Sequence, residues 1–129
     1  MNLTGFHHVA IICSDYTRSK AFYVDLLGFT ILEETYRSER DSYKLDLGLP
    51  DGNRIELFSM PGAPPRASYP EAQGLRHLAF ATPDIEGVAA ELKQMGIAVE
   101  DLRVDSLTGK RFAFFADPDG LPLELYEFG

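Results

Sequence analysis

The feature that most constrains this chain is an internal repeat. Gly-Phe-His-His8-Val-Ala opens the first half and Gly-Leu-Arg-His77-Leu-Ala opens the second, while Arg-Ile-Glu56-Leu and Pro-Leu-Glu124-Leu close them. The histidine precedes the glutamate by 48 residues in the first half and by 47 in the second. A repeat much longer than the roughly 20–50 residues of a solenoid unit indicates a duplicated module within one globular body. Two similar modules would carry their histidine and glutamate to equivalent places.

Local patterns predict the same order of elements in both halves. Each half begins with a strand, continues with a helix that starts at an aspartate and ends at Gly28 or Gly96, and closes with three strands. The predicted strands span residues 6–13, 30–36, 43–49 and 54–59, then 75–81, 98–104, 111–116 and 122–126. We therefore expect an α+β fold of two tandem βαβββ modules.

The expected organisation is one domain over residues 1–129. Module 1 covers 5–60, a linker with four prolines covers 61–74, and module 2 covers 75–128. A net charge of −8 argues against binding to nucleic acid, which depends on clustered basic side chains. No apolar stretch approaches the ~20 residues of a membrane helix, and Cys13 is the only cysteine, so we expect a cytoplasmic protein without a disulfide or a thiolate zinc site.

The alternation of side chains along the first strand indicates which of the two adjacent histidines, His7 or His8, lies on the face away from the helix. Side chains alternate along a strand, so His8 shares a face with Ala10 and not with the apolar residues Ile11 and Cys13, which suit the helix-covered side. The same phase places His77 beside Ala79. The small alanines leave room for a ligand on that face. His7 faces the other way and is expected to serve packing or an interface.

Each glutamate lies between two apolar residues of a strand, which predicts partial burial. A buried carboxylate needs a partner, because an unpaired buried charge costs several kcal/mol. The alternatives to a metal are an ion pair of Glu56 with Arg54 or Arg76, and a solvated edge position for Glu124. Equivalent placement in both repeats favours the metal. Two imidazoles and two carboxylates suit one divalent ion.

The chain resembles the vicinal oxygen chelate superfamily in several motifs. They are His8-Val-Ala-Ile, Phe-Tyr-Val-Asp-Leu-Leu-Gly-Phe29, Ile-Glu56-Leu, Arg-His77-Leu-Ala-Phe and Asp-Pro-Asp-Gly-Leu-Pro-Leu-Glu124-Leu. It is similar to glyoxalase I in particular, and most similar to the YaeR-like branch of glyoxalase-related proteins. The resemblance implies that the two modules form a cupped, incomplete barrel around a metal.

The resemblance also implies an activity. Bacterial glyoxalase I uses a His, Glu, His and Glu set with Ni, Co or Zn, so these metals are favoured here over Mn or Fe. The implied reaction is the lyase or isomerase step of lactoylglutathione lyase, in which a proton is transferred through a metal-bound enediolate of a 2-oxoaldehyde–thiol hemithioacetal. Glutathione is then the candidate co-substrate. Glu124 is the expected base, and Glu56 a ligand that can loosen.

Two other functions stay open at this stage. One is an Fe(II)-dependent extradiol-type dioxygenase, disfavoured by the fourth protein ligand. The other is a metal-containing binding module without turnover. Family resemblance further implies a homodimer, with each metal site within one chain or shared between two. Candidate substrate contacts are the basic residues near the predicted cup: Arg111 first, then Lys110, Arg37, Arg40, Lys44 and Arg66.

Overall fold

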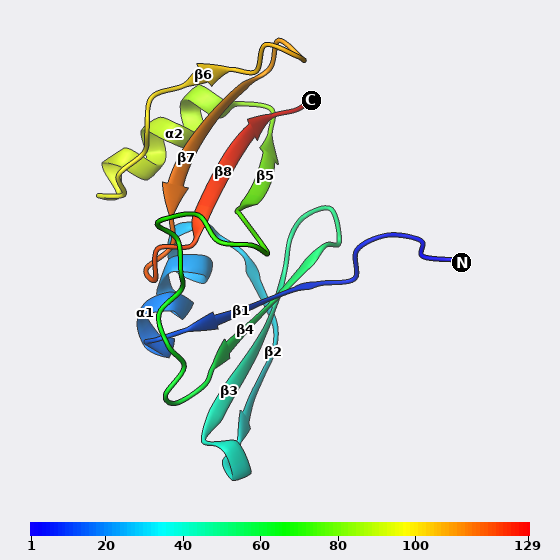
Figure 1. Cartoon of the computed structure of the whole chain (residues 1–129), viewed down its shortest axis with the longest axis vertical. Helices are drawn as coiled ribbons and strands as arrows, with labels where there is room; N and C mark the ends of the chain where they lie inside the picture. The colour runs from blue at the N-terminus through cyan, green and yellow to red at the C-terminus, as the bar shows by residue number, and fades with distance from the viewer. The chain divides into compact units, whose positions relative to one another are not determined.

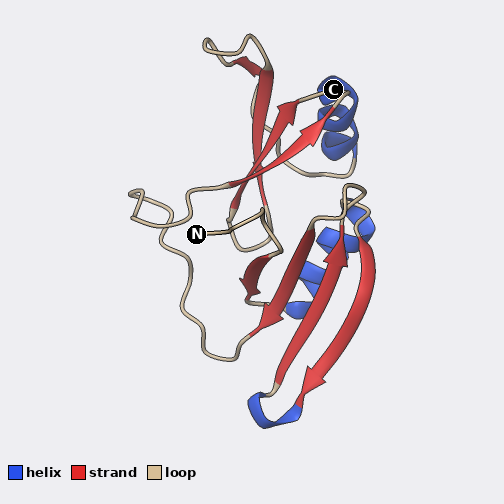
Figure 2. Cartoon of the chain, turned by 90° about the vertical axis from the view of Figure 1, so that its right-hand side faces the viewer, coloured by secondary structure: helices blue, strands red, loops and turns tan.

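The computed structural model describes residues 1–129 and divides into two compact units, Met1–Pro65 and Arg66–Gly129, called here the first and second modules. Each module is a four-stranded mixed sheet with helix packed against one face (Figures 1 and 2). The strand order is β1-β4-β3-β2 in the first module and β5-β8-β7-β6 in the second. The predicted α+β class and the two βαβββ modules are confirmed.

The elements follow one another in the predicted order. The first module contains β1 (Val9–Cys13), α1 (Tyr16–Lys20), the π-helical segment η1 (Ala21–Leu26), β2 (Thr30–Arg37), the 3-10 turn η2 (Ser38–Arg40), β3 (Ser42–Gly48) and β4 (Arg54–Ser59). The second contains β5 (Leu78–Thr82), α2 (Ile85–Gln94), β6 (Arg103–Val104), β7 (Arg111–Ala116) and β8 (Pro122–Glu127). None of the helices is long and apolar enough to cross a bilayer.

Side-chain caps fix where the helices begin. Asp15 accepts a hydrogen bond from the Arg18 backbone N–H at 3.1 Å, and Asp84 accepts one from Gly87 at 3.0 Å. Such a cap satisfies a backbone donor that has no partner within the helix. The helical stretch of the first module, which continues from α1 into η1, ends just before Gly28, and α2 ends just before Gly96; both glycines have positive φ, as predicted.

The predicted strand 98–104 is wrong over most of its length. Only Arg103–Val104 pairs with β7, while the preceding residues contribute a single ladder bond from the Glu100 N–H to the Phe114 carbonyl. Glu100 and Asp101 are exposed and bury no apolar surface that would hold an edge strand in place. β1 and β5 also begin later than predicted, so His8 and His77 lie just before their strands.

The core of each module lies between the sheet and its helix. It is built by alternate strand residues such as Ile11, Leu57, Phe115 and Leu125, all at most 6% exposed. The opposite face of each sheet, called the open face here, carries the intervening residues. In parallel register Ala10 lies beside Glu56 and Ala79 beside Glu124. Strand phase therefore places both glutamates on the open faces.

Candidate metal centre

The first module brings His8 and Glu56 together. His8 precedes Ala10 by two residues and so shares its face, next to Glu56 on the parallel neighbour β4. His8 Nδ1 lies 3.5 Å from Glu56 Oε2. The glutamate side chain is 16% exposed and the histidine 38%, so the carboxylate is half-buried while the imidazole reaches solvent.

The second module brings His77 and Glu124 together in the equivalent place. His77 Nε2 lies 2.8 Å from Glu124 Oε2. The His77 ring also contacts the Phe114 ring edge to face, with 5.1 Å between centroids. Glu124 is only 8% exposed, so it is not a solvated edge acid. The predicted pairing of one histidine with one glutamate per module is thus present in both.

The two pairs have different neighbours on β3 and β7. Asp46 lies across from Glu56, and Phe114 lies at the equivalent position across from Glu124. Lys44 Nζ is 3.3 Å from Asp46 and 3.9 Å from Glu56. Within the first module the basic side chain that pairs with Glu56 is therefore Lys44 and not Arg54, while a pair with Arg76 of the second module stays a prediction. Asp46 was not among the predicted site residues, although its alternation with the buried residues Leu45 and Leu47 of β3 places it on the open face.

His7 lies beside His8 and outside the module core. It is exposed, its Nδ1 is 2.9 Å from His8 Nδ1, and the two rings meet edge to face. A packing role within the module is not seen, and a role in an interface stays a prediction.

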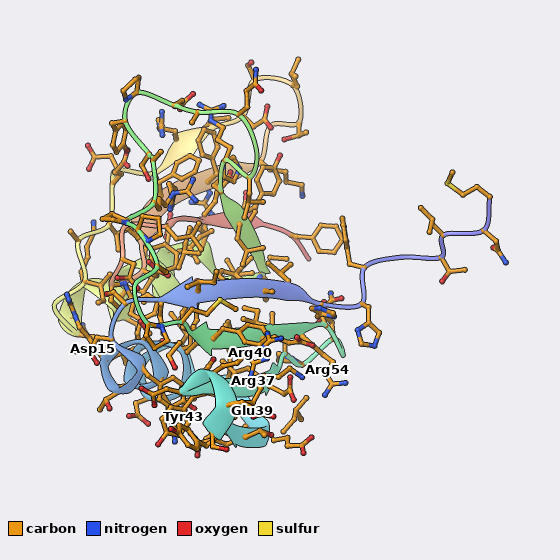
Figure 3. The ribbon with its side chains drawn as sticks, turned by 60° about the horizontal axis from the view of Figure 1, so that its bottom comes forward. Asp15, Arg37, Glu39, Arg40, Tyr43 and Arg54 are labelled. Atoms are coloured by element: carbon orange, nitrogen blue, oxygen red, sulfur yellow. The ribbon has the colours of Figure 1, made fainter.

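Arg37 reaches the open face of the first module. Its guanidinium lies 5.0 Å from the centroid of the Phe58 ring, two residues beyond Glu56 on β4, and its Nη2 donates to Ser42 Oγ at 2.9 Å. Arg40 lies with Glu39 in η2, the turn that joins β2 to β3 (Figure 3). Of these two predicted substrate contacts, Arg37 has the more direct relation to the open face.

Arg111 lies on the helix-covered side of the second sheet. It shares the phase of Ala113 and Phe115, and it pairs with Glu86 of α2 and, at 2.7 Å, with Glu127. These hydrogen bonds raise the pKa of Arg111, first through Glu127 and then through Glu86. Lys110 is exposed in the preceding loop. A substrate role for either residue stays a prediction, and for Arg111 it would require breaking two ion pairs.

The open face of the second module carries an arginine that the sequence did not indicate. The Arg103 guanidinium lies 5.0 Å from the Phe112 ring centroid and 5.6 Å from that of Phe114. Within either module, no three His, Cys, Asp or Glu side chains gather into a metal-binding group. A centre with all four ligands therefore stays a prediction.

The two βαβββ modules and their equivalent His–Glu pairs define the glyoxalase type of fold. The chain belongs to the Glyoxalase/Bleomycin resistance protein/Dioxygenase superfamily, whose family description matches residues 5–125.

Its similarity to individual proteins extends over nearly the whole chain. It is 60% identical to the uncharacterized protein YwkD of Bacillus subtilis (strain 168) over 98% of this chain and 99% of that protein. It is 57% identical to the uncharacterized protein YaeR of Escherichia coli (strain K12) over 98% of each. The crystal structure of a glyoxalase family protein from Enterococcus faecalis matches with a TM-score of 0.91 and 53% identity, covering 98% of this chain and all of that one. The expected likeness to the YaeR-like branch is confirmed.

Proposed function

We propose that the chain is a metal-dependent, glyoxalase I-like lyase or isomerase whose four ligands are His8, Glu56, His77 and Glu124. The observation that supports this most is the recurrence of one His–Glu pair at the equivalent place on the open face of each module. Each pair offers one imidazole nitrogen and one carboxylate, so the two modules together supply the four donors that the proposal needs.

The residues present fit a divalent metal ion. Imidazole nitrogens and carboxylate oxygens together suit Ni, Co or Zn, with Mn or Fe as weaker candidates. Glu124 is buried, and its Oε2 faces one imidazole nitrogen while Oε1 remains available. A cation is a suitable further partner for such a carboxylate. The ion would polarise adjacent oxygens of a bound substrate and stabilise negative charge that develops on them.

We assign Glu124 as the general base, a role that requires its carboxylate to detach from the ion during the reaction, because a metal-bound carboxylate is a weak base. It would take a proton from the carbon next to a carbonyl and return it to the neighbouring carbon, which isomerises the substrate without any net oxidation. A base must be shielded from competing water and yet close to the reacting carbon. Its neighbours Phe114 and His77 limit its access to water, and its side chain is only 10% exposed.

Glu56 has a more charged environment and suits the role of a ligand. The Lys44 ammonium lies 3.9 Å from it and also neutralises Asp46. The ammonium and Asp46 thus surround Glu56 with charged groups, whereas an aromatic ring, Phe114, lies across from Glu124 at the equivalent position. This asymmetry between the modules supports proton transfer by Glu124. The substrate in this proposal is the hemithioacetal of a 2-oxoaldehyde and a thiol, with glutathione as the first thiol to test.

The decisive variant is Glu124→Gln, with Glu91→Gln at an exposed position of α2 as the matched control. The assay uses tag-free protein loaded with Ni, Co, Zn, Mn or Fe and supplied with methylglyoxal and glutathione. We expect Glu124→Gln to lower kcat by about 10²–10⁴-fold, the usual contribution of a general base. The control should keep wild-type kcat. A folded Glu124→Gln protein with near-normal kcat would remove Glu124 from this role.

The same preparation separates the alternative functions. Oxygen consumption with a catechol by the iron-loaded protein would indicate a dioxygenase instead. Tight binding of a small molecule without a product would indicate a binding module. We further propose a homodimer, and mixing His8→Gln with His77→Gln protein tests whether subunits share sites. Recovered activity in the mixture would require ligands from two chains.

A further inference from the structure

The second module contains a cavity that borders His77. Its volume is about 420 Å³, which lies within the range of about 300–1,000 Å³ of small-molecule sites. Three arginines line it, and we call it the arginine cavity: Arg66 and Arg76 from the segment before β5, and Arg103 from β6. Two glutamates, Glu71 and Glu100, also line it, so positive charge is in excess there. This excess stands out in a chain with a net charge of −8.

Arg66 is held in place entirely by neutral groups. Its Nε donates to Ser68 Oγ at 2.7 Å, and its Nη2 donates to the carbonyls of Leu75 at 3.0 Å and Arg76 at 3.4 Å. These bonds orient the half-buried guanidinium without compensating its charge. Its Nη1 remains available to a ligand. A fixed, uncompensated guanidinium is suited to binding an anion, because little side-chain freedom is lost when the anion arrives.

Arg103 is oriented by aromatic stacking. Its guanidinium lies over the Phe112 and Phe114 rings, which leaves the N–H groups at its edge for a hydrogen-bond acceptor. The nearest carboxylate, Glu100, is 3.7 Å away and 68% exposed, so solvent screens this pair. Arg76 likewise pairs with Glu71 at an exposed position. Phe114 itself contacts His77, so the stacked arginine lies close to the candidate metal ligand.

The rest of the cavity wall is largely apolar. Phe114, Phe115, Ala98 and Pro122 contribute to it. A planar guanidinium recognises carboxylate with two parallel hydrogen bonds. We propose that the arginine cavity binds a small carboxylic acid with an apolar body, whose carboxylate is held by Arg66 and Arg103. The carboxylic acid can be tested for binding whether or not the proposed function holds. The further idea that this acid is one arm of the substrate at the metal centre rests on the proposed function.

The test uses the full chain treated with a chelator, so that metal chemistry plays no part. Isothermal titration compares 4-phenylbutanoate with 4-phenylbutanamide, which has the same shape and no charge. We expect the acid to bind at least tenfold more tightly than the amide. Arg66→Gln and Arg103→Gln should each raise the Kd for the acid at least tenfold. Lys93→Gln on α2 removes the same charge from the same module away from the cavity and should leave the Kd within twofold.

Two features keep the test decisive. Arg66 also donates to the backbone of its own segment, so Arg66→Gln can unfold the protein. In that case the test relies on Arg66→Lys and Arg103→Gln, once circular dichroism has shown that both are folded. Equal affinity for acid and amide, no binding of the acid, or an unchanged Kd in Arg103→Gln would overturn the proposal. Equal competition by inorganic phosphate would overturn the preference for a carboxylate with an apolar body.

The proposed function and this inference fail separately. Carboxylate binding by a protein that never turns over methylglyoxal and glutathione would leave the arginine cavity standing and remove the activity. If the protein turns over methylglyoxal and glutathione and KM is unchanged in Arg66→Lys and Arg103→Gln, the proposed activity stands. The idea that the cavity holds one arm of the substrate is then removed.

Discussion

The Phe114 ring packs on the open face of the second module. The variant Phe114→Leu measures how much its ring contacts contribute to the free energy of unfolding. The ring meets the rings of His77, at 5.1 Å, and Phe112, at 6.0 Å, both edge to face, and it lies under the Arg103 guanidinium. Leucine keeps most of the apolar surface and removes these ring contacts. The substitution therefore isolates the aromatic contribution from burial.

The expected magnitude follows from the contacts that are lost. An aromatic pair contributes about 0.5–1.5 kcal/mol beyond its buried area, so two pairs contribute roughly 1–3 kcal/mol. Phe112 retains a share of the cation–π contact, which is worth about 0.5–1 kcal/mol at exposed sites. We expect Phe114→Leu to lower the free energy of unfolding by about 2 kcal/mol. Phe58→Leu in the first module loses only the contact with Arg37 and should cost at most about 1 kcal/mol.

Urea unfolding with a chelator present measures both variants without a contribution from bound metal. The expected result is a larger loss for Phe114→Leu than for Phe58→Leu with unchanged m-values. Equal losses in the two variants would refute the reasoning, since only Phe114 has two ring partners beside its arginine.

Two further stability predictions follow from local contacts. Arg111, through its side-chain and then its backbone hydrogen bonds, lowers the pKa of Glu127 below the ordinary 4.5, so the interaction stabilises the fold fully above that value and less as pH falls through the lowered pKa. The stability difference between wild type and Glu127→Gln in urea unfolding should therefore stay constant from pH 7 to 5 and shrink below 4.5; a difference independent of pH would contradict this. Asp84→Ala removes the cap of α2 and should cost about 1 kcal/mol in the same assay, whereas an unchanged midpoint would show that the cap contributes nothing.

Much of the fold and the core of the site can be predicted from the repeat and from strand phase. The alternation of Ile11 and Cys13 with Ala10 is sufficient to place His8 on the open face, and the same logic holds for His77. The aspartate caps and the glycines after the helices give correct helix ends. These patterns depend on residues that are close in sequence, so they determine the local structure without contacts from distant segments.

The parts that were missed depend on contacts between distant segments. Arg103 acquires its orientation from Phe112 and Phe114 on a neighbouring strand, and no local pattern indicates that stacking. The prediction of a strand over residues 98–104 was wrong because this segment lies at the edge of the sheet with both of its faces exposed. Arg111 is different, since its phase with Ala113 already predicts the helix-covered side. Asp46 could have been found in the same way from its phase with Leu45 and Leu47.

The most direct test of the central proposal is the metal content of the purified, tag-free chain and of two histidine variants. We predict one bound divalent ion per chain in wild type, measured by plasma mass spectrometry after dialysis against each metal. His8→Gln and His77→Gln should each weaken the binding of that ion at least tenfold, because one ion takes a pair from each module. Two ions per chain, or a variant of either histidine that binds metal as tightly as wild type, would contradict the proposed centre.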